Sequence, residues 1–230
     1  MNVSVAMASY NGEKYIKEQI ESICSQLAPN DELIISDDGS TDSTRAIIKY
    51  LSEKYGFIKL IDGPQMGIVA NFSNAIMNCN NEIIFLSDQD DIWCEGKVDC
   101  IKKIFRDNPH KSLVLHNALL LEGEREYSQL IKSYSQGVIR NIIKSSYWGC
   151  CMAFRKDFIQ KHLPLDSCIV AHDQIIGLLS EKSDLTIYLN VPLIKHRIHF
   201  DNKTNSLSLF KKICFRISMI KGLYYVTRKK

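Results

Sequence analysis

Over its first 115 or so residues the chain alternates short apolar runs with segments of helical periodicity, and this alternation decides the fold class. The apolar runs are typical of buried strands, while the segments between them place their apolar residues on one helical face. Because parallel strands need crossover connections, the order β-α-β-α-β-α-β predicts an α/β fold with a mostly parallel central sheet and helices on both faces. The expected strands are residues 3–8, 32–36, 57–61, 82–86 and 113–116, and the expected helices are residues 13–27, 41–55, 69–79 and 96–105.

The remainder of the chain is less regular. Its segments of helical periodicity are residues 129–144 and 170–180, and its strand-like segments are residues 148–154, 185–189 and 193–199. No internal repeat or low-complexity linker divides these segments. We therefore expect one folded domain over residues 1–205, followed by a distinct tail over residues 206–230.

Several classes of protein are excluded by the composition. With 45% hydrophobic and 24% charged residues, the chain is neither disordered nor collagen-like. No apolar run approaches the length of a membrane span, and the first residues lack the basic segment of a secretory signal. The eight cysteines form no C-x-x-C pair and have no Cys/His ligand spacing, so we expect reduced thiols in a cytoplasmic protein.

Polar, mostly acidic clusters follow three of the expected strands. Residues 9–12 (SYNG) follow the first strand, residues 37–42 (DDGSTD) the second, and residues 88–91 (DQDD) the fourth. Ligands of parallel sheets bind beyond the carboxyl ends of the strands, where these clusters should share one rim. This rim is the predicted ligand site.

The cluster Asp88-Gln89-Asp90-Asp91 gives the sharpest chemical signal. Three carboxylates packed this closely repel one another unless a cation lies among them. Hard oxygen ligands favour Mn²⁺ or Mg²⁺, which usually share phosphate oxygens with a substrate. The alternative is a solvated acidic turn that caps a helix starting near Trp93.

The other two clusters suit a nucleotide base. A carboxylate of Asp37 or Asp38 can accept the ring N–H of uracil, thymine or guanine, and Tyr10 can stack on the base. A plain turn with Ser40 or Asp42 as helix N-cap is also expected there, and the two interpretations are compatible.

Two further motifs lie in the second half. His172-Asp173 opens an expected helix, where Asp173 is either a general base or an ordinary acid in a first turn. In the segment HRIH, Arg197 suits a diphosphate and His199 suits a metal or phosphate, and strand alternation puts both on one face.

Taken together, these segments resemble family 2 glycosyltransferases with the GT-A fold, and within them the bacterial rhamnosyltransferase-like branch. The resemblance covers residues 1 to about 205. The matching segments, in order, are VSVAMASYNGEKYI, ELIISDDGSTDST, GPQMGIVANFSNAI, IIFLSDQDDIW, AHDQ and HRIHFDN.

This resemblance implies an inverting, metal-dependent hexosyltransferase that moves a sugar, rhamnose in this branch, from a nucleoside-diphosphate sugar to a glycan or lipid-linked acceptor of a cell-surface polysaccharide. Residues 1–115 would bind the donor and residues 116–205 the acceptor. The chain departs from the wider family at His172, where Glu is usual. The implied roles are nucleotide binding by Ser9, Tyr10, Asn11, Asp37, Asp38 and Asn71; metal binding by Asp88, Asp90 and His199; diphosphate binding by Arg197; acceptor binding by Trp148, Gly149, Cys150 and His172; and catalysis by Asp173.

The C-terminal tail differs from the rest of the chain in its charge. Residues 206–230 contain seven basic residues and no acidic residue, although the whole chain has a net charge of only +3. A basic amphipathic helix there predicts peripheral binding to the inner face of the plasma membrane, and the alternative is a helix packed on the domain. Nothing else in the sequence suggests nucleic acid. Its apolar stripe is Phe210, Ile213, Cys214, Ile217, Ile220 and Tyr224.

Two other functions remain open at this stage. A nucleotidyltransferase that makes a nucleotide sugar would need a Gly-rich phosphate loop, of which SYNGEK is a poor version. A catalytically degenerate nucleotide-binding protein would keep the donor site without transfer. Release of pyrophosphate favours the first, and binding without metal-dependent transfer favours the second.

Overall fold

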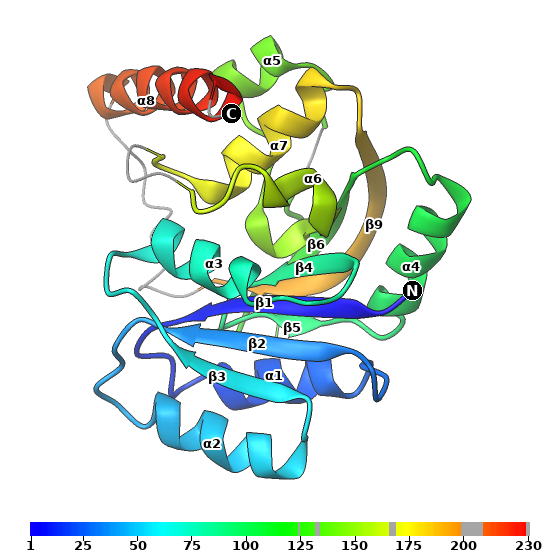
Figure 1. Ribbon diagram of the computed structural model, residues 1–230, viewed down its shortest axis with the longest axis vertical. Coiled ribbons are helices and arrows are strands. Elements are labelled where there is room, and N and C mark those ends of the chain that lie inside the picture. The colour runs from blue at the N-terminus through cyan, green and yellow to red at the C-terminus, as the bar shows by residue number, and fades with distance from the viewer. Residues whose placement is uncertain (124, 132–133, 166–168, 199–208, 229–230) are drawn as a thin grey trace.

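The computed structural model describes residues 1–123, 125–131, 134–165, 169–198 and 209–228. In this part of the chain one nine-stranded sheet runs through the molecule, with helices on both of its faces (Figure 1). The strands are β1 (Val3–Ser9), β2 (Glu32–Asp37), β3 (Ile58–Asp62), β4 (Ile83–Ser87), β5 (Ile92–Trp93), β6 (Leu113–Glu122), β7 (Arg125–Gln129), β8 (Met152–Arg155) and β9 (Thr186–Arg197). The helices are α1 (Ile16–Cys24), α2 (Thr44–Lys54), α3 (Ile68–Met77), α4 (Lys97–Asp107), α5 (Val138–Ile143), the 3-10 turn η1 (Gly149–Cys151), α6 (Lys156–Gln160), α7 (His172–Lys182) and α8 (Leu209–Arg228).

The order of the strands creates a switch point beside β1. The sheet runs β3-β2-β1-β4-β8-β6-β9-β5, and the pairs among β3, β2, β1 and β4 are all parallel. The chain therefore builds outward from β1 in one direction and then returns to add β4 on the other side. Helices α1 and α2 lie below these strands and α3 lies above them (Figure 1). Such a reversal leaves a crevice at the carboxyl ends of the two strands that flank it.

A mostly parallel sheet is confirmed. Strand β8 runs antiparallel to both β4 and β6, so β6 points the same way as β4, and β9 is parallel to β6. Strands β1 and β4 are buried at every position, which explains why their sequences are mostly apolar.

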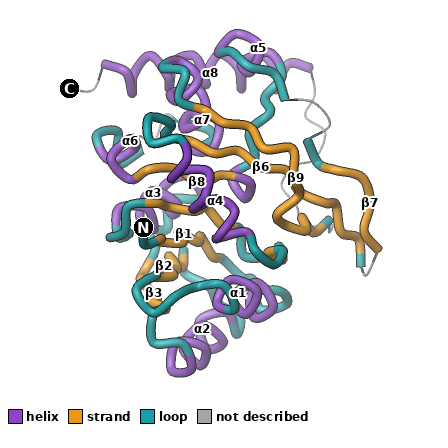
Figure 2. The backbone as a smooth tube through the Cα atoms, turned by 90° about the vertical axis from the view of Figure 1, so that its right-hand side faces the viewer, coloured by secondary structure: helices purple, strands orange, loops and turns teal. Residues whose placement is uncertain are grey.

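The predicted helix over residues 129–144 is wrong. The structure has a hairpin of β6 and β7, seen projecting at the right of Figure 2, and only the short helix α5. The buried Asn117 side chain accepts the N–H of Ile131 at 2.9 Å and donates to its carbonyl at 2.9 Å. This paired contact holds the chain extended where the apolar spacing alone suggests a helix.

Two other boundaries also differ from expectation. The two strands predicted over residues 185–189 and 193–199 are joined in the single strand β9, which ends at Arg197, and residue 199 lies outside the described residues. The register of β9 against β6 shifts between His116 and Asn117 and so accommodates the polar break in the sequence. Trp93 lies in the short strand β5, which pairs with β9, and not at a helix start. The predicted strand over residues 148–154 begins only after the turn η1.

Helix α8 packs on the domain through the face opposite its predicted apolar stripe. Met219 and Val226 are buried, and Gly222 lies close to Ile169 and Ile175. The side chain of Phe210 lies outside the described residues. Among the helices that the structure describes, none combines the length and the apolar character needed to cross a membrane.

Candidate active site

The loops after β1 and β4 meet at the switch point through one side chain, Gln89. Its Oε1 accepts the N–H of Tyr10 at 2.9 Å, and its Nε2 donates to the carbonyl of Tyr10 at 3.1 Å. Gly12 lies so close that a Cβ there would stand 2.4 Å from Gln89 Oε1. Gln89 therefore ties the acidic loop to the first loop while leaving the Tyr10 ring 56% exposed.

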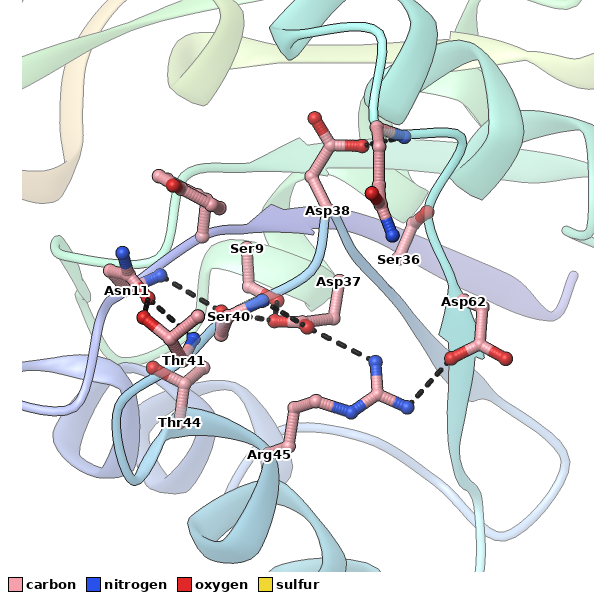
Figure 3. Close-up of polar contacts among 12 residues, drawn as sticks. Ser9, Asn11, Ser36, Asp37, Asp38, Ser40, Thr41, Thr44, Arg45 and Asp62 are labelled. Atoms are coloured by element: carbon pink, nitrogen blue, oxygen red, sulfur yellow. Dashed lines mark hydrogen bonds and ion pairs between the residues drawn. The ribbon is translucent and has the colours of Figure 1, made fainter.

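Asp37, at the end of β2, is committed to contacts within the chain (Figure 3). Its Oδ2 accepts the hydroxyls of Ser9 at 2.9 Å and Ser40 at 2.6 Å, and its Oδ1 accepts the N–H of Ser40 at 3.0 Å. Arg45 donates to Oδ1 at 3.1 Å and bridges to Asp62 at 2.7 Å. Burial alone would raise the pKa of Asp37, but these hydrogen bonds lower it. The ionised Asp37 thus fixes the loop.

Asp38 has a different environment. Figure 3 shows its carboxylate pointing away from Asp37. Oδ1 accepts the N–H of Gln65 at 2.6 Å, and Oδ2 accepts the N–H of Gly67 at 3.1 Å. The side chain is partly exposed and each oxygen keeps lone-pair capacity, so Asp38 can still accept a proton donor from a ligand.

The remaining predicted nucleotide residues form the scaffold of the first loop. Asn11 donates its backbone N–H to Ser40 Oγ at 2.8 Å, and its Oδ1 accepts the N–H of Thr41 at 2.8 Å. Asn71 is buried and donates to the carbonyl of Ser9 at 3.2 Å. Its Oδ1 has no hydrogen-bond partner among the described residues. Ser9, Asn11 and Asn71 therefore shape the loop from within.

The carboxylate of Asp88 lies among other acids. Burial, and then repulsion from Asp91, Asp90 and Asp173, raises the pKa of Asp88 to about 8, although His196 opposes the shift. Asp173, from the second half of the chain, makes the smallest of these contributions to the pKa of Asp88. A carboxyl that is this crowded by negative charge fits a divalent cation.

A buried cluster that the sequence did not predict lies behind this loop. Asp91 Oδ1 is 2.9 Å from His196 Nδ1, and Cys150 Sγ is 3.9 Å from the same nitrogen. These three side chains converge closely enough to hold a metal ion, and Asp91 Oδ2 has no partner among the described residues. Burial opposes charge on His196, but hydrogen bonds with Asp91 and Cys150 outweigh it and raise the pKa of His196 to about 12. With no metal bound, that proton neutralises Asp91.

A buried cation and two aromatic rings surround the cluster. Lys97 is fully buried, lies 3.9 Å from the centroid of the Trp93 ring and donates to the carbonyl of Cys150 at 3.3 Å. Burial lowers the pKa of Lys97 to about 8. The Trp148 ring lies edge-on to the imidazole of His196, with centroids 5.7 Å apart. Trp148 and Cys150, which were predicted to bind the acceptor, therefore contact His196, the residue that bonds Asp91 of the acidic loop.

Arg197 joins β9 to the same loop. Its backbone N–H donates to Asp91 Oδ1 at 3.1 Å, and its Nε donates to the carbonyl of Asp90 at 3.0 Å. Its guanidinium also bonds Glu18 at 2.7 Å and lies over the Tyr15 ring. The predicted partner of this residue, His199, lies outside the described residues.

The start of α7 carries the second half of the site. His172 stacks on Phe72 with ring centroids 4.1 Å apart, and its Nε2 is buried with no partner among the described residues. Burial lowers the pKa of His172. A Cβ at Gly149 would lie 3.1 Å from that Nε2, so only a small residue fits there. The next residue, Asp173, is partly exposed and accepts the N–H of Gln174 at 2.8 Å.

Comparison with known proteins identifies the family. The sequence matches the model for Glycosyl transferase family 2 over residues 4–163. The chain belongs to glycosyltransferase family 2. The match includes the loops that carry Asp38, Asp88 and Asp90, and it ends before Asp173 and Arg197, so the family assignment rests on the first rim loops and the sheet that positions them.

Relatives of this family 2 chain include bacterial proteins with glycosyltransferase names. It is 27% identical to the dTDP-rhamnosyl transferase RfbG of Shigella flexneri over 95% of this chain and 80% of RfbG. It is 25% identical to an uncharacterized glycosyltransferase of Nostoc over 83% of this chain, which spans only 65% of that relative.

Solved structures show the same fold. S. aureus TarS, crystallised in complex with UDP-GlcNAc, superposes with a TM-score of 0.75 at 17% identity, covering 100% of this chain and 72% of TarS. The fold of this family 2 chain is therefore GT-A, as the sequence predicted.

Proposed function

We propose that this chain is an inverting, metal-dependent glycosyltransferase that uses a nucleoside-diphosphate sugar. The observation that supports the proposal is that Asp173 lies beside Gly149, where an added Cβ would stand 3.6 Å from the Asp173 Cβ, and is near enough to Asp88 to contribute to its raised pKa. Donor binding by residues 1–115 and acceptor binding by residues 116–205 would place the reacting groups between them.

The nucleotide is assigned to the loops after β1 and β2. Each oxygen of the buried Asp37 accepts two hydrogen bonds from the protein, whereas each oxygen of the partly exposed Asp38 accepts one, so we assign the contact with the base to Asp38. Tyr10 is exposed and held by its backbone, which suits stacking on the base. Ser9, Asn11, Asp37 and Asn71 then act by positioning this loop.

Asp88 and Asp90 would hold the divalent cation, Mn²⁺ or Mg²⁺, with His199 as a further ligand. Burial and repulsion from Asp91 and Asp90 raise the pKa of Asp88, and a bound cation would offset this repulsion. When bound, the cation would neutralise the leaving diphosphate. Arg197 holds the backbone of Asp90 and adds positive charge beside the loop.

Asp173 is proposed as the general base. The acceptor hydroxyl loses its proton to the Asp173 carboxylate as its oxygen bonds to the anomeric carbon, and the bond from that carbon to the diphosphate oxygen breaks. The site supplies one base and no separate nucleophile, which gives a single displacement with inversion. His172, whose buried Nε2 has no partner among the described residues, and the adjacent Gly149 are proposed to position the acceptor.

The name of one relative suggests a donor sugar to test, and the acceptor is our proposal. RfbG is named a dTDP-rhamnosyl transferase, so we propose rhamnose as the first sugar to test. A growing glycan or a lipid-linked acceptor of a cell-surface polysaccharide, reached from the cytoplasmic face of the membrane, completes the proposal.

A ligand panel tests the proposed donor class. We expect one nucleotide sugar to raise the melting temperature only when Mn²⁺ is present, because the cation should bridge protein and diphosphate. At 100 times its dissociation constant a ligand stabilises the folded state by about 2.7 kcal/mol. Differential scanning fluorimetry measures the shift. Equal stabilisation by nucleoside triphosphates, together with pyrophosphate release, would favour a nucleotidyltransferase instead.

Replacing Gln89 with Ala should weaken donor binding with less effect on the chemical step. The change removes the two hydrogen bonds that hold Tyr10, worth about 1–2 kcal/mol together, or roughly a tenfold rise in KM. Steady-state kinetics with varied donor measures this rise. Gln136→Ala, which removes a hydrogen bond to Asp184 far from the rim, is the matched control. An unchanged KM in Gln89→Ala would show that the clamp on Tyr10 does not serve the donor.

A further inference from the structure

An exposed strip of large apolar side chains runs along α8. Ile213, Ile217, Ile220 and Tyr224 are between 48% and 56% exposed. Their spacing of three or four residues puts them on one side of the helix, and the opposite side packs on α7. The strip is therefore not used by the fold of the described chain.

Helix α5 extends this strip. Ile139 and Ile143 are four residues apart and are 76% and 62% exposed. Arg216 of α8 donates from Nε to the carbonyl of Ile143 at 2.9 Å, which fastens the two helices together. Both views show α5 and α8 side by side at the same end of the molecule (Figures 1 and 2). The two helices in contact therefore both leave apolar side chains exposed at this end of the molecule, and we call these residues together the α5–α8 face.

The charge on this face has one sign. Neither α5 nor α8 contains an acidic residue. Apolar side chains edged by cations are the chemistry that binds an anionic lipid surface, because the apolar groups enter the headgroup boundary while the cations attract the lipid phosphates. The exposed basic residues on and next to the two helices are Arg140, Lys144, Lys211, Lys221 and Arg228.

We propose that the α5–α8 face binds an anionic membrane surface. The binding element is a composite of two helices fixed to the domain, and not a tail that moves independently of it. Because α8 packs on α7, whose first turn carries Asp173, the bound orientation would hold the catalytic rim at a fixed height above the bilayer. The purpose of this arrangement rests on the proposed use of a lipid-linked acceptor.

Co-sedimentation of the full chain with vesicles tests the proposal. We expect binding to phosphatidylcholine vesicles that contain phosphatidylglycerol, and little binding to phosphatidylcholine alone. The double variant Ile217→Ser/Ile220→Ser should lower the partition coefficient at least about tenfold, because two partly inserted side chains are lost. Tyr50→Ser/Met77→Ser, which removes exposed apolar groups from α2 and α3, is the matched control and should bind as wild type.

The variant Ile139→Ser/Ile143→Ser separates the two-helix face from the tail alone. If both helices bind the membrane, this variant should lose vesicle binding to a similar extent. If α8 alone binds it, vesicle binding should not change, and that result would overturn the proposal of a two-helix surface. Absent vesicle binding, or a dimer on light scattering that both double variants dissociate, would assign the strip to another occupant and overturn the proposal. Mn²⁺-dependent stabilisation by the donor should survive in every variant, so failure of membrane binding is distinguishable from failure of the proposed function.

Discussion

Asp173→Asn is expected to lower turnover by about 10²–10⁴-fold, the usual range for loss of a general base, while donor binding stays close to wild type. The amide keeps the size of the side chain and can still accept the N–H of Gln174, so the start of α7 is preserved. It cannot take the proton of an acceptor hydroxyl. Initial rates at saturating donor and acceptor measure the loss, and thermal shifts with the donor and Mn²⁺ measure binding.

Asp157→Asn is the matched control for this experiment. Asp157 is also an acid in the first turn of a helix, α6, and is exposed. Its replacement changes the net charge equally and should leave turnover unchanged. Retention of full activity in Asp173→Asn would move the base to another residue and remove the main support for the proposed mechanism.

Asp88→Asn should have opposite effects on activity and on the stability of the metal-free protein. Activity should fall by at least about 10²-fold, because a ligand of the cation is lost. At alkaline pH, the free energy of unfolding of the metal-free variant should be higher than that of the metal-free wild type. The folded pKa of Asp88 is raised from an ordinary 3.8 to about 8, so between these values the folded state holds a proton that the unfolded state releases. In the metal-free wild type, the contribution of Asp88 to the free energy of unfolding therefore falls as pH rises from about 4 to about 8. The amide of Asp88→Asn does not titrate, so this fall is absent from the variant.

Melting temperatures at pH 5 and pH 8.5, with and without Mn²⁺, measure these effects. In the wild type the stabilisation by Mn²⁺ should grow with pH, because the cation and the proton compete for the same carboxyl. In Asp88→Asn both the growth and the stabilisation should disappear. Asp99→Asn, an exposed acid in the first turn of α4, controls for net charge. A variant that keeps its Mn²⁺ shift would place the cation elsewhere, for instance at Asp91, Cys150 and His196.

The parts of the fold that could be predicted are those whose signal is local. Strands β1, β2 and β4 are buried along almost their whole length, so apolar residues dominate their sequences, and turn residues follow each of them. The rim was predictable for the same reason, since it lies where these apolar runs end. The helix predicted over residues 129–144 failed because a distant side chain, Asn117, decides the backbone conformation of Ile131.

The unpredicted parts of the site depend on contacts between residues far apart in the sequence. Asp91 and His196 are separated by 105 positions, and the sequence around either residue does not predict a contact with the other. Gln89 lies between Asp88 and Asp90 in the sequence, and nothing local indicates that its side chain bonds the backbone of Tyr10. The signal that could have indicated this contact is the position of a polar side chain between two predicted metal ligands. On α8 the periodicity identified an apolar stripe but could not say that the residues between its members would be the buried ones.

Strand β9 has a consequence for when the protein becomes competent during its synthesis. Its last residues bond Asp90 and Asp91 and pair with β5, so the acidic loop receives its final supports from a segment that leaves the ribosome long after the loop itself. A nascent polypeptide that ends before residue 196 therefore lacks the hydrogen bonds to Asp90 and Asp91. The acidic loop can take its final form only after β9 has joined the sheet.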